Sequence, residues 1–369
     1  MGRLKLLLLV GVGALAVAIA LGPRSSRAHA LTAPYVAIDL GVVYGDVSSS
    51  ANAINDAGEL VGSGSSGSNA RAIVWTQGGG MSALQPNGFH PSANAISPNG
   101  HIAGGMEPNT VPSHPEPNPV YVWQNAADPA PVSIGTLGGA YASAAGINDS
   151  EEVVGFSETT TVNQQHAFVW TPAGGMIDIG TLGGDTSFAT AVNASGVVVG
   201  WSMTASNLAE HAFRWTPASG MVDLGALILR GSSDARGIND SGEIVGSAST
   251  STSVQTSDAV SWTAAGKIVD LGGLPSSLSS VASAVSNSGQ IVGGSAISNV
   301  ERLFSYTPSG GMVELDGLGG SYPEIAGVND SGTIVGTSTN AAGQEHATLW
   351  QPADAPPVAP ARPTLDSDS

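Results

Sequence analysis

Residues 176–217 read MIDIGTLGGDTSFATAVNASGVVVGWSMTASNLAEHAFRWTP, and related stretches recur along the chain. The stretch holds four short apolar runs separated by glycine-rich or polar turns, and no run has the periodicity of a ten-residue amphipathic helix. Each unit is therefore expected to form four β-strands. The repeat is followed most easily at one aromatic position, which returns every 44 to 48 residues: Trp75, Trp123, Trp170, Trp215, Trp262, Tyr306 and Trp350.

Seven units of four strands predict an all-β fold, a seven-bladed β-propeller with four-stranded antiparallel blades. The first run of each unit places small residues at alternate positions, as Ala189 and Ala191 do, which suits strands that crowd near a propeller axis. A short turn of the Asn-Asp-Ser-Gly type, as at 239–242, leads into a β-branched second run that ends in glycine. The third run carries the aromatic position, which we expect to pack between blades. An open β-solenoid is the alternative architecture.

The two ends of the repeat region complement each other. The fourth run occurs once before the first unit, as AIDL at 37–40, and no fourth run follows the last third run at 347–350. If these two segments pair, the N-terminal strand completes the last blade and leaves no open sheet edge. A solenoid does not require this offset, so we predict a closed ring.

The first thirty residues have the features of a signal peptide. Arg3 and Lys5 precede an uncharged apolar run at 6–21, and Ala28-His29-Ala30 has the small-x-small form of a cleavage site. Residues 1–30 are therefore expected to be removed on export, with an uncleaved membrane anchor as the alternative. The propeller is expected to span 31–350, and the Pro- and Ala-rich segment 351–369 to be a disordered tail.

Charge and cysteine content fit an exported protein. Cleavage leaves seven basic residues against 29 acidic ones, which lowers the formal net charge from −18 to −22. Such a chain repels nucleic acid and anionic lipid surfaces, so neither is an expected partner, and no membrane insertion is expected after cleavage. With no cysteine, stability must come from buried apolar area. We predict a secreted, cell-surface or periplasmic monomer.

The units at 176–217 also resemble the extracellular HAF repeat family. The resemblance rests on Met-Ile-Asp-Ile-Gly-Thr-Leu-Gly-Gly at 176–184, on His211-Ala212-Phe213 and on Trp215-Thr216-Pro217, and in looser form it covers about 36–350. It implies an exported repeat protein of unassigned activity. It supplies no catalytic residue.

Three histidines invite a metal interpretation that the repeat does not favour. His166, His211 and His346 occupy equivalent positions of different units, so in a ring they would be rotated apart and could not converge on one ion. A structural hydrogen bond at the entry to the third strand is the favoured role. The Asn-Asp-Ser-Gly turns lack the spaced carboxylates of calcium loops. No catalytic residue, metal site or cofactor is predicted.

Ligand-binding residues are predicted on one face of the ring. The connections from fourth to first strands and from second to third strands must emerge on the same side, and they hold most of the length variation. Several aromatic residues there are candidates for stacking on a ligand, with packing between blades as the alternative role. They are Tyr44, Phe89, Tyr141, Phe188, Trp201 and Tyr322. The second unit adds a group that suits metal or acid–base chemistry, with a mobile Pro-rich loop as the alternative: His90, Glu107, His114 and Glu116.

Three functions are compatible with this pattern. A non-catalytic binding or surface-interaction module, with a glycan or an extracellular protein as partner, fits the aromatic face and the lack of a convergent catalytic set. A purely structural envelope or matrix protein is the first alternative, since burial could explain every repeated residue. An extracellular polysaccharide-acting enzyme, a lyase or glycosidase, is the second alternative, and it would need paired carboxylates or a His and Tyr set.

Overall fold

The computed structural model describes residues 35–67, 70–84, 91–106, 118–128, 130–252, 256–298, 300–321 and 323–356. Within these ranges the chain is all-β, apart from one 3-10 turn at Ala205–Asn207. The predicted signal peptide at 1–30 and the end of the predicted tail, 357–369, lie outside the described residues.

The strands form four-stranded antiparallel sheets, in which consecutive strands pair with one another. One listing in chain order gives the sheets: β2 (Ser48–Ile54), β3 (Leu60–Ser65), β4 (Ala70–Thr76) and β5 (Gly80–Ala83); β6 (Pro91–Ile96), β7 (Ile102–Met106), β8 (Val120–Trp123) and β9 (Val132–Gly135); β10 (Gly138–Ile147), β11 (Val153–Thr159), β12 (Gln165–Thr171) and β13 (Gly175–Asp178); β14 (Gly183–Val192), β15 (Val198–Thr204), β16 (Glu210–Thr216) and β17 (Gly220–Asp223); β18 (Ser233–Ile238), β19 (Ile244–Ser249), β20 (Ser257–Trp262) and β21 (Ile268–Gly272); β22 (Ser279–Val285), β23 (Ile291–Ile297), β24 (Val300–Thr307) and β25 (Gly311–Leu315); β26 (Glu324–Val328), β27 (Ile334–Thr339), β28 (Glu345–Pro352) and β1 (Tyr35–Asp39). A single parallel bridge between Gln165 and Thr186 joins the third and fourth of these sheets.

The glycine that ends each second run has a steric reason. Each first strand contains a bulge, as between Ala189 and Ala191, and its carbonyl oxygens there face the second strand closely. A Cβ on Gly200 would collide with the carbonyl oxygen of Phe188, and the equivalent glycines of the other sheets meet the same obstacle: Gly62, Gly104, Gly155, Gly246, Gly293 and Gly336.

Apolar side chains fill the spaces between neighbouring sheets. Trp123 of β8, for example, packs against Val61, Ala72 and Val74 of the preceding sheet. The indole Nε1 of Trp262 donates a hydrogen bond of 3.2 Å to the carbonyl of Leu224, which follows the last strand of the sheet before it. The repeated aromatic position thus lies where two sheets meet. Trp75, Trp123, Trp262 and Trp350 are buried, and Trp170, Trp215 and Tyr306 are half-buried.

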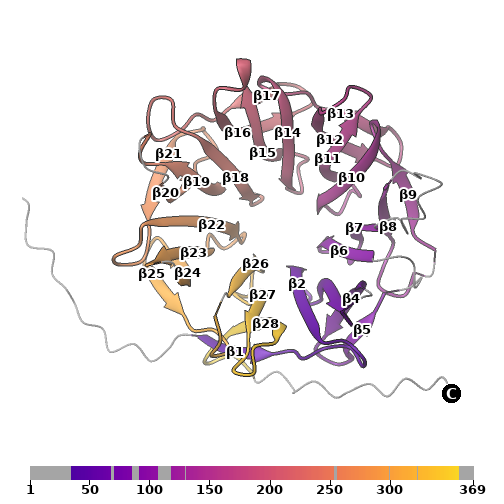
Figure 1. Ribbon diagram of the computed structural model, residues 1–369, viewed down its shortest axis with the longest axis vertical. Coiled ribbons are helices and arrows are strands. Elements are labelled where there is room, and N and C mark those ends of the chain that lie inside the picture. The colour runs from indigo at the N-terminus through magenta and orange to yellow at the C-terminus, as the bar shows by residue number, and fades with distance from the viewer. Residues whose placement is uncertain are drawn as a thin grey trace, which may run out of the picture. The chain divides into compact units, whose positions relative to one another are not determined.

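The first strands contact one another in chain order, and β26 also contacts β2. In Figure 1 these strands, β2, β6 and β22 among them, point toward a common centre. A belt of side-chain amides links their ends, because the Nδ2 of each asparagine donates to a carbonyl of the next sheet at 3.0–3.3 Å. The donors are Asn55, Asn148, Asn193, Asn239 and Asn329. Ser97 and Ser286 occupy the two remaining positions of this asparagine belt.

The predicted pairing of 37–40 with 347–350 is present. β1 pairs antiparallel with β28, with Ala37 opposite Trp350 and Asp39 opposite Thr348. The backbone N–H of Leu40 extends the ladder by donating to the carbonyl of Ala347 at 3.0 Å. The N-terminal strand therefore completes the sheet formed by the last three strands, which Figure 1 shows as an indigo strand beside yellow ones.

Candidate functional site

One position on each first strand and its partner on the second strand vary strongly among the sheets. First strands begin and second strands end on the same side, here called the loop face, because the two strands are antiparallel. Directly beside the crowded glycine, one cross-strand pair lies near this face in every sheet. These rim pairs are Ser50–Ser63, Ser92–Gly105, Ser143–Phe156, Phe188–Trp201, Asp234–Ser247, Val281–Gly294 and Glu324–Thr337.

Two neighbouring rim pairs contribute Phe156, Phe188 and Trp201 to a row of four aromatic side chains, here called the aromatic row, and Tyr141 of β10 is the fourth. Tyr141 of β10 lies 5.7 Å from Phe156 of β11, measured between ring centroids. Phe156 lies 4.2 Å from Phe188 of β14, in the next sheet. Phe188 stacks on Trp201 of β15 at 4.4 Å with an interplanar angle of 16°. The row crosses from one sheet to the next without a break.

The aromatic row is partly open to solvent. Tyr141 is 37% exposed, and Phe156, Phe188 and Trp201 are half-buried. By contrast, Phe168 and Phe213, which belong to the cores between the sheets, have no exposed surface. Apolar rings that remain at the surface in a continuous row provide an apolar strip against which a ligand can pack.

A groove of about 600 Å³ lies beside the Tyr141 end of the row. It is lined by Gly138, Gly139, the end of β11 with Glu158, and the turn that leads to β12. The Glu158 carboxylate accepts a hydrogen bond of 3.2 Å from the backbone N–H of Ala140, the residue before Tyr141. This end of the row therefore combines a recess with a carboxylate.

Carboxylates also flank the Trp201 end. Glu210 of β16 lies opposite Met203, two residues along β15 from Trp201. Burial raises the pKa of the Glu210 carboxyl, and the nearby Asp234 carboxylate raises it further. Asp234 itself accepts from the Ser247 hydroxyl and pairs with the Arg236 Nε at 2.6 Å. The local charge is thus negative, with Arg236 already bound to Asp234.

The structure brings three of the predicted ligand-binding residues together: Tyr141, Phe188 and Trp201. Tyr44 is 75% exposed in the connection before β2 and is not part of the row. The other predicted residues lie outside the described part of the chain: Phe89, His90, Glu107, His114, Glu116 and Tyr322. Phe156 was missed, although alignment of Val154-Gly155-Phe156 with Val199-Gly200-Trp201 would have placed it in the row.

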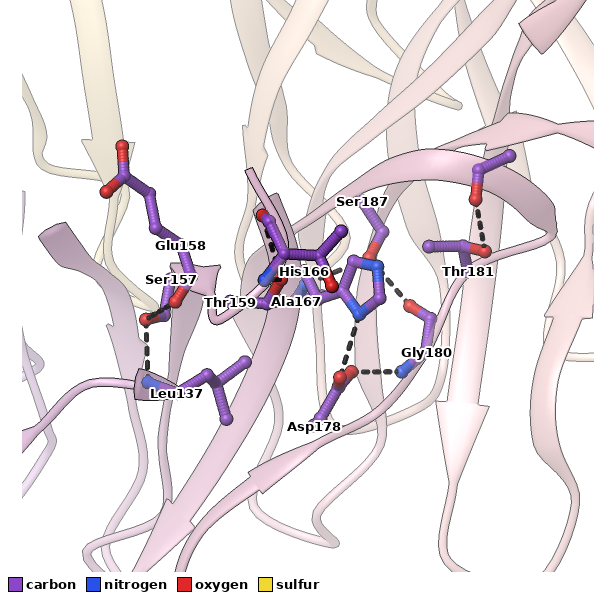
Figure 2. Close-up of polar contacts among 12 residues, drawn as sticks. Leu137, Ser157, Glu158, Thr159, His166, Ala167, Asp178, Gly180, Thr181 and Ser187 are labelled. Atoms are coloured by element: carbon purple, nitrogen blue, oxygen red, sulfur yellow. Dashed lines mark hydrogen bonds and ion pairs between the residues drawn. The ribbon is translucent and has the colours of Figure 1, made fainter. Parts of the chain in front are cut away.

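The repeated histidines form hydrogen bonds with aspartates across the third and fourth strands. His166 Nδ1 lies 2.7 Å from Asp178, and Figure 2 shows the ring pointing toward this carboxylate. The same contact joins His211 to Asp223 and His346 to Asp39 at 2.8–2.9 Å. These are structural contacts repeated in three sheets, in agreement with the expected hydrogen-bonding role.

Ser187 lies close to His166 and Asp178 in Figure 2, which raises the question of a catalytic triad. Its hydroxyl donates to the carbonyl of Gly180 at 2.7 Å and accepts from the backbone N–H of Ala167 at 2.9 Å. Three other sheets repeat this serine bridge, through Ser49, Ser233 and Ser280. The serine joins backbone segments and is not directed at the imidazole as a nucleophile.

Two further observations bear on chemistry, and both concern only the described residues. No group of three or more His, Asp or Glu side chains lies close enough together there to hold a metal ion. No helix in that part of the chain has the length and apolar character needed to cross a membrane.

No known family profile matches the chain, and no curated protein matches its sequence, so membership of the HAF repeat family stays a prediction. Among solved structures, the chain is similar to a streptogramin B lyase, with 11% identity and a TM-score of 0.56 over 86% of this chain and 97% of that one. Virginiamycin B lyase from Staphylococcus aureus gives 12% identity and a TM-score of 0.56 over 86% and 99%. One of two prolyl endopeptidases gives 13% and 0.54 over 84% of this chain but only 51% of that one. At these identities the likeness concerns the fold alone, and that fold is a β-propeller.

Proposed function

We propose that the sheets are seven blades of a closed β-propeller. Three observations support this: β1 completes the sheet of β26–β28, β26 contacts β2, and the Asn329 side chain donates to the carbonyl of Asn55 at 3.1 Å. A hollow of about 160 Å³ lined by the ends of all the first strands also fits a shared axis. Because the first and last sheets are joined, an open solenoid explains the contacts less well.

We propose further that the protein is an exported, monomeric binding module, and that its aromatic row binds a glycan. The observation that carries the proposal is the unbroken sequence of partly exposed rings at Tyr141, Phe156, Phe188 and Trp201. Sugar rings present apolar C–H faces that stack on aromatic side chains, and their hydroxyl groups bond to carboxylates at the edge of such a platform. Glu158 and Glu210 lie near the two ends of the row.

Binding without catalysis is favoured over the enzyme alternative by what surrounds the row. The carboxylates near it lie toward opposite ends, beside Tyr141 and beyond Trp201, instead of facing each other across one stacking position. The similar lyase and peptidase structures share a fold with this chain, and their activities are not transferred to it. The second-unit group of His90, Glu107, His114 and Glu116 remains the specific form of the enzyme hypothesis.

The proposal is tested by screening the protein for binding to immobilised glycans, with Trp201→Ala and Phe188→Ala as test variants. Loss of one stacking partner is expected to weaken binding about tenfold, which corresponds to about 1.4 kcal/mol. Tyr44→Ala is the matched control, because Tyr44 is an exposed aromatic residue outside the row. The proposal is wrong if the screen finds no glycan ligand, or if both test variants bind every ligand as the parent protein does. Capture of a protein partner through the row would favour the protein-binding alternative.

A further inference from the structure

Both ends of the aromatic row are flanked by acidic side chains. Glu158 lies at the Tyr141 end, and Glu210 and Asp234 lie beyond the Trp201 end. Asp185, three residues before Phe188, is a fourth carboxylate on the same strand as that ring, and it accepts from the Asn207 Nδ2 at 2.7 Å. Carboxylates therefore lie near both ends of the row.

Positive charge does not balance these carboxylates. Arg236 is the one cationic side chain that pairs with any of them among the described residues, and its Nε is engaged with Asp234 at 2.6 Å. The half-buried Glu210 lies next to this pair, and both burial and the Asp234 carboxylate raise the pKa of its carboxyl. When burial and a neighbouring carboxylate disfavour the ionised form of a carboxyl group, a bound cation stabilises that form.

The row also limits the shape of a ligand. Four rings follow one another at centroid separations of 5.7, 4.2 and 4.4 Å across two sheets, with tilted contacts at the first two and a stacked contact at the third. This arrangement offers an elongated apolar strip with carboxylates near both ends. A ligand that fits both properties has several rings with apolar faces joined in a chain and carries positive charge at their edges.

We infer that the aromatic row selects linear glycans that carry protonated amino groups over glycans that carry carboxylates or sulfates. This inference rests on the proposed function, and it adds the charge class of the ligand. The exposed parts of the four aromatic rings would contact the sugar rings, and Glu210, with Asp234 beside it, would bind an ammonium group near Trp201.

Three oligosaccharides of equal length separate the contribution of the aromatic rings from that of the carboxylates. A β-1,4-glucosamine hexamer carries ammonium groups, its fully N-acetylated counterpart is neutral, and a galacturonate hexamer is anionic. We expect the glucosamine hexamer to bind about tenfold more tightly than the N-acetylated one at pH 6 and low salt, and the galacturonate hexamer not to bind. Titration calorimetry measures all three, and added salt should reduce the preference for the cationic ligand.

Glu210→Gln tests the residue assignment. This variant should weaken binding of the glucosamine hexamer about fivefold and leave the N-acetylated hexamer unaffected, because only the charge is removed. Glu345→Gln is the matched control, since Glu345 is exposed at the start of β28 in a sheet that adds no ring to the row. Equal binding of the cationic and neutral hexamers, or an unchanged preference in Glu210→Gln, would overturn the inference. If Trp201→Ala still weakened binding about tenfold in that case, the proposed function would stand, whereas failure of all three ligands would count against both.

Discussion

Removal of residues 31–41 should destabilise the domain severely, because β1 is the strand that completes the last sheet. Leu40 is only 2% exposed and belongs to the core shared with the sheet of β2–β5, so its loss alone should cost about 2–5 kcal/mol. The Tyr35 hydroxyl accepts from the Gln290 Nε2 at 2.7 Å, which adds about 1 kcal/mol. Asp39 pairs with His346 at 2.8 Å and adds about 0.5 kcal/mol.

These losses amount to about 3.5–6.5 kcal/mol, a large share of the 5–15 kcal/mol that stabilises a typical folded domain. Thermal and urea unfolding of the truncated protein should therefore show a Tm lowered by about 10 °C or more, together with aggregation through the uncovered edge of β28. Val36→Thr is the matched control on the same strand, since Val36 is 52% exposed and its replacement should change stability by less than about 0.5 kcal/mol. An unchanged Tm after truncation would refute both the role of β1 and the closed ring.

Three further changes have expected outcomes. Ser97→Asn should add the missing amide donor of the asparagine belt, directed at the carbonyl of Asn148. The free energy of unfolding, measured in urea, should rise by about 1 kcal/mol. A loss of stability would show that the belt does not tolerate an amide at this position. Asp258→His should replace a repulsive pair with Asp270 by the His–Asp contact of other sheets, and it should raise the Tm more at pH 6 than at pH 8, with a gain of about 0.5 kcal/mol. Burial raises the pKa of the Glu243 carboxyl, so ionisation of this group opposes folding above that pKa. Glu243→Gln should therefore raise the Tm at pH 8 but not at pH 4. Equal Tm shifts at both pH values would contradict this cause.

The strand pattern was predictable from the sequence because each structural requirement recurs in every unit. The offset of 37–40 indicated its pairing with 347–350, since a fourth run without its own unit has one place to pair. The terminal glycines of the second runs were visible as a pattern, but their cause was not. Only the structure shows that the bulged carbonyl of the first strand occupies the space of a Cβ at Gly200.

The aromatic row was only partly predictable, because it arises from contact between different sheets. The sequence gives no direct sign that Phe156 meets Phe188, since 32 positions separate them and neither lies in the other's strand pair. Position in a connection was also a poor guide, as Tyr44 shows by lying outside the row. Comparison of equivalent positions among units would have been the better signal.

The partners of the repeated histidines illustrate the same lesson. Wherever the third strand carries His166, His211 or His346, the facing fourth strand carries an aspartate. The first sheet has Ala83 in place of that aspartate and Arg71 in place of the histidine. Arg71 pairs instead with the buried Asp46 at 3.2 Å. The replacement of the histidine by Arg71 is thus accompanied by an acidic partner at a different position. Covariation within the repeats therefore identifies structural contacts.

The rim pairs show the opposite behaviour, and this supports the proposal that their face binds the ligand. Every rim pair lies beside the same crowded glycine and the same bulge, so the backbone places no requirement on its side chains that differs between sheets. Yet one pair is aromatic at Phe188–Trp201, and another, Val281–Gly294, opens onto a groove of about 410 Å³. Differences that the fold does not demand are best explained by a ligand that meets each sheet differently. Repeated sheets can present a surface that varies from sheet to sheet because their stability resides in the repeated residues, which leaves the rim pairs free to vary.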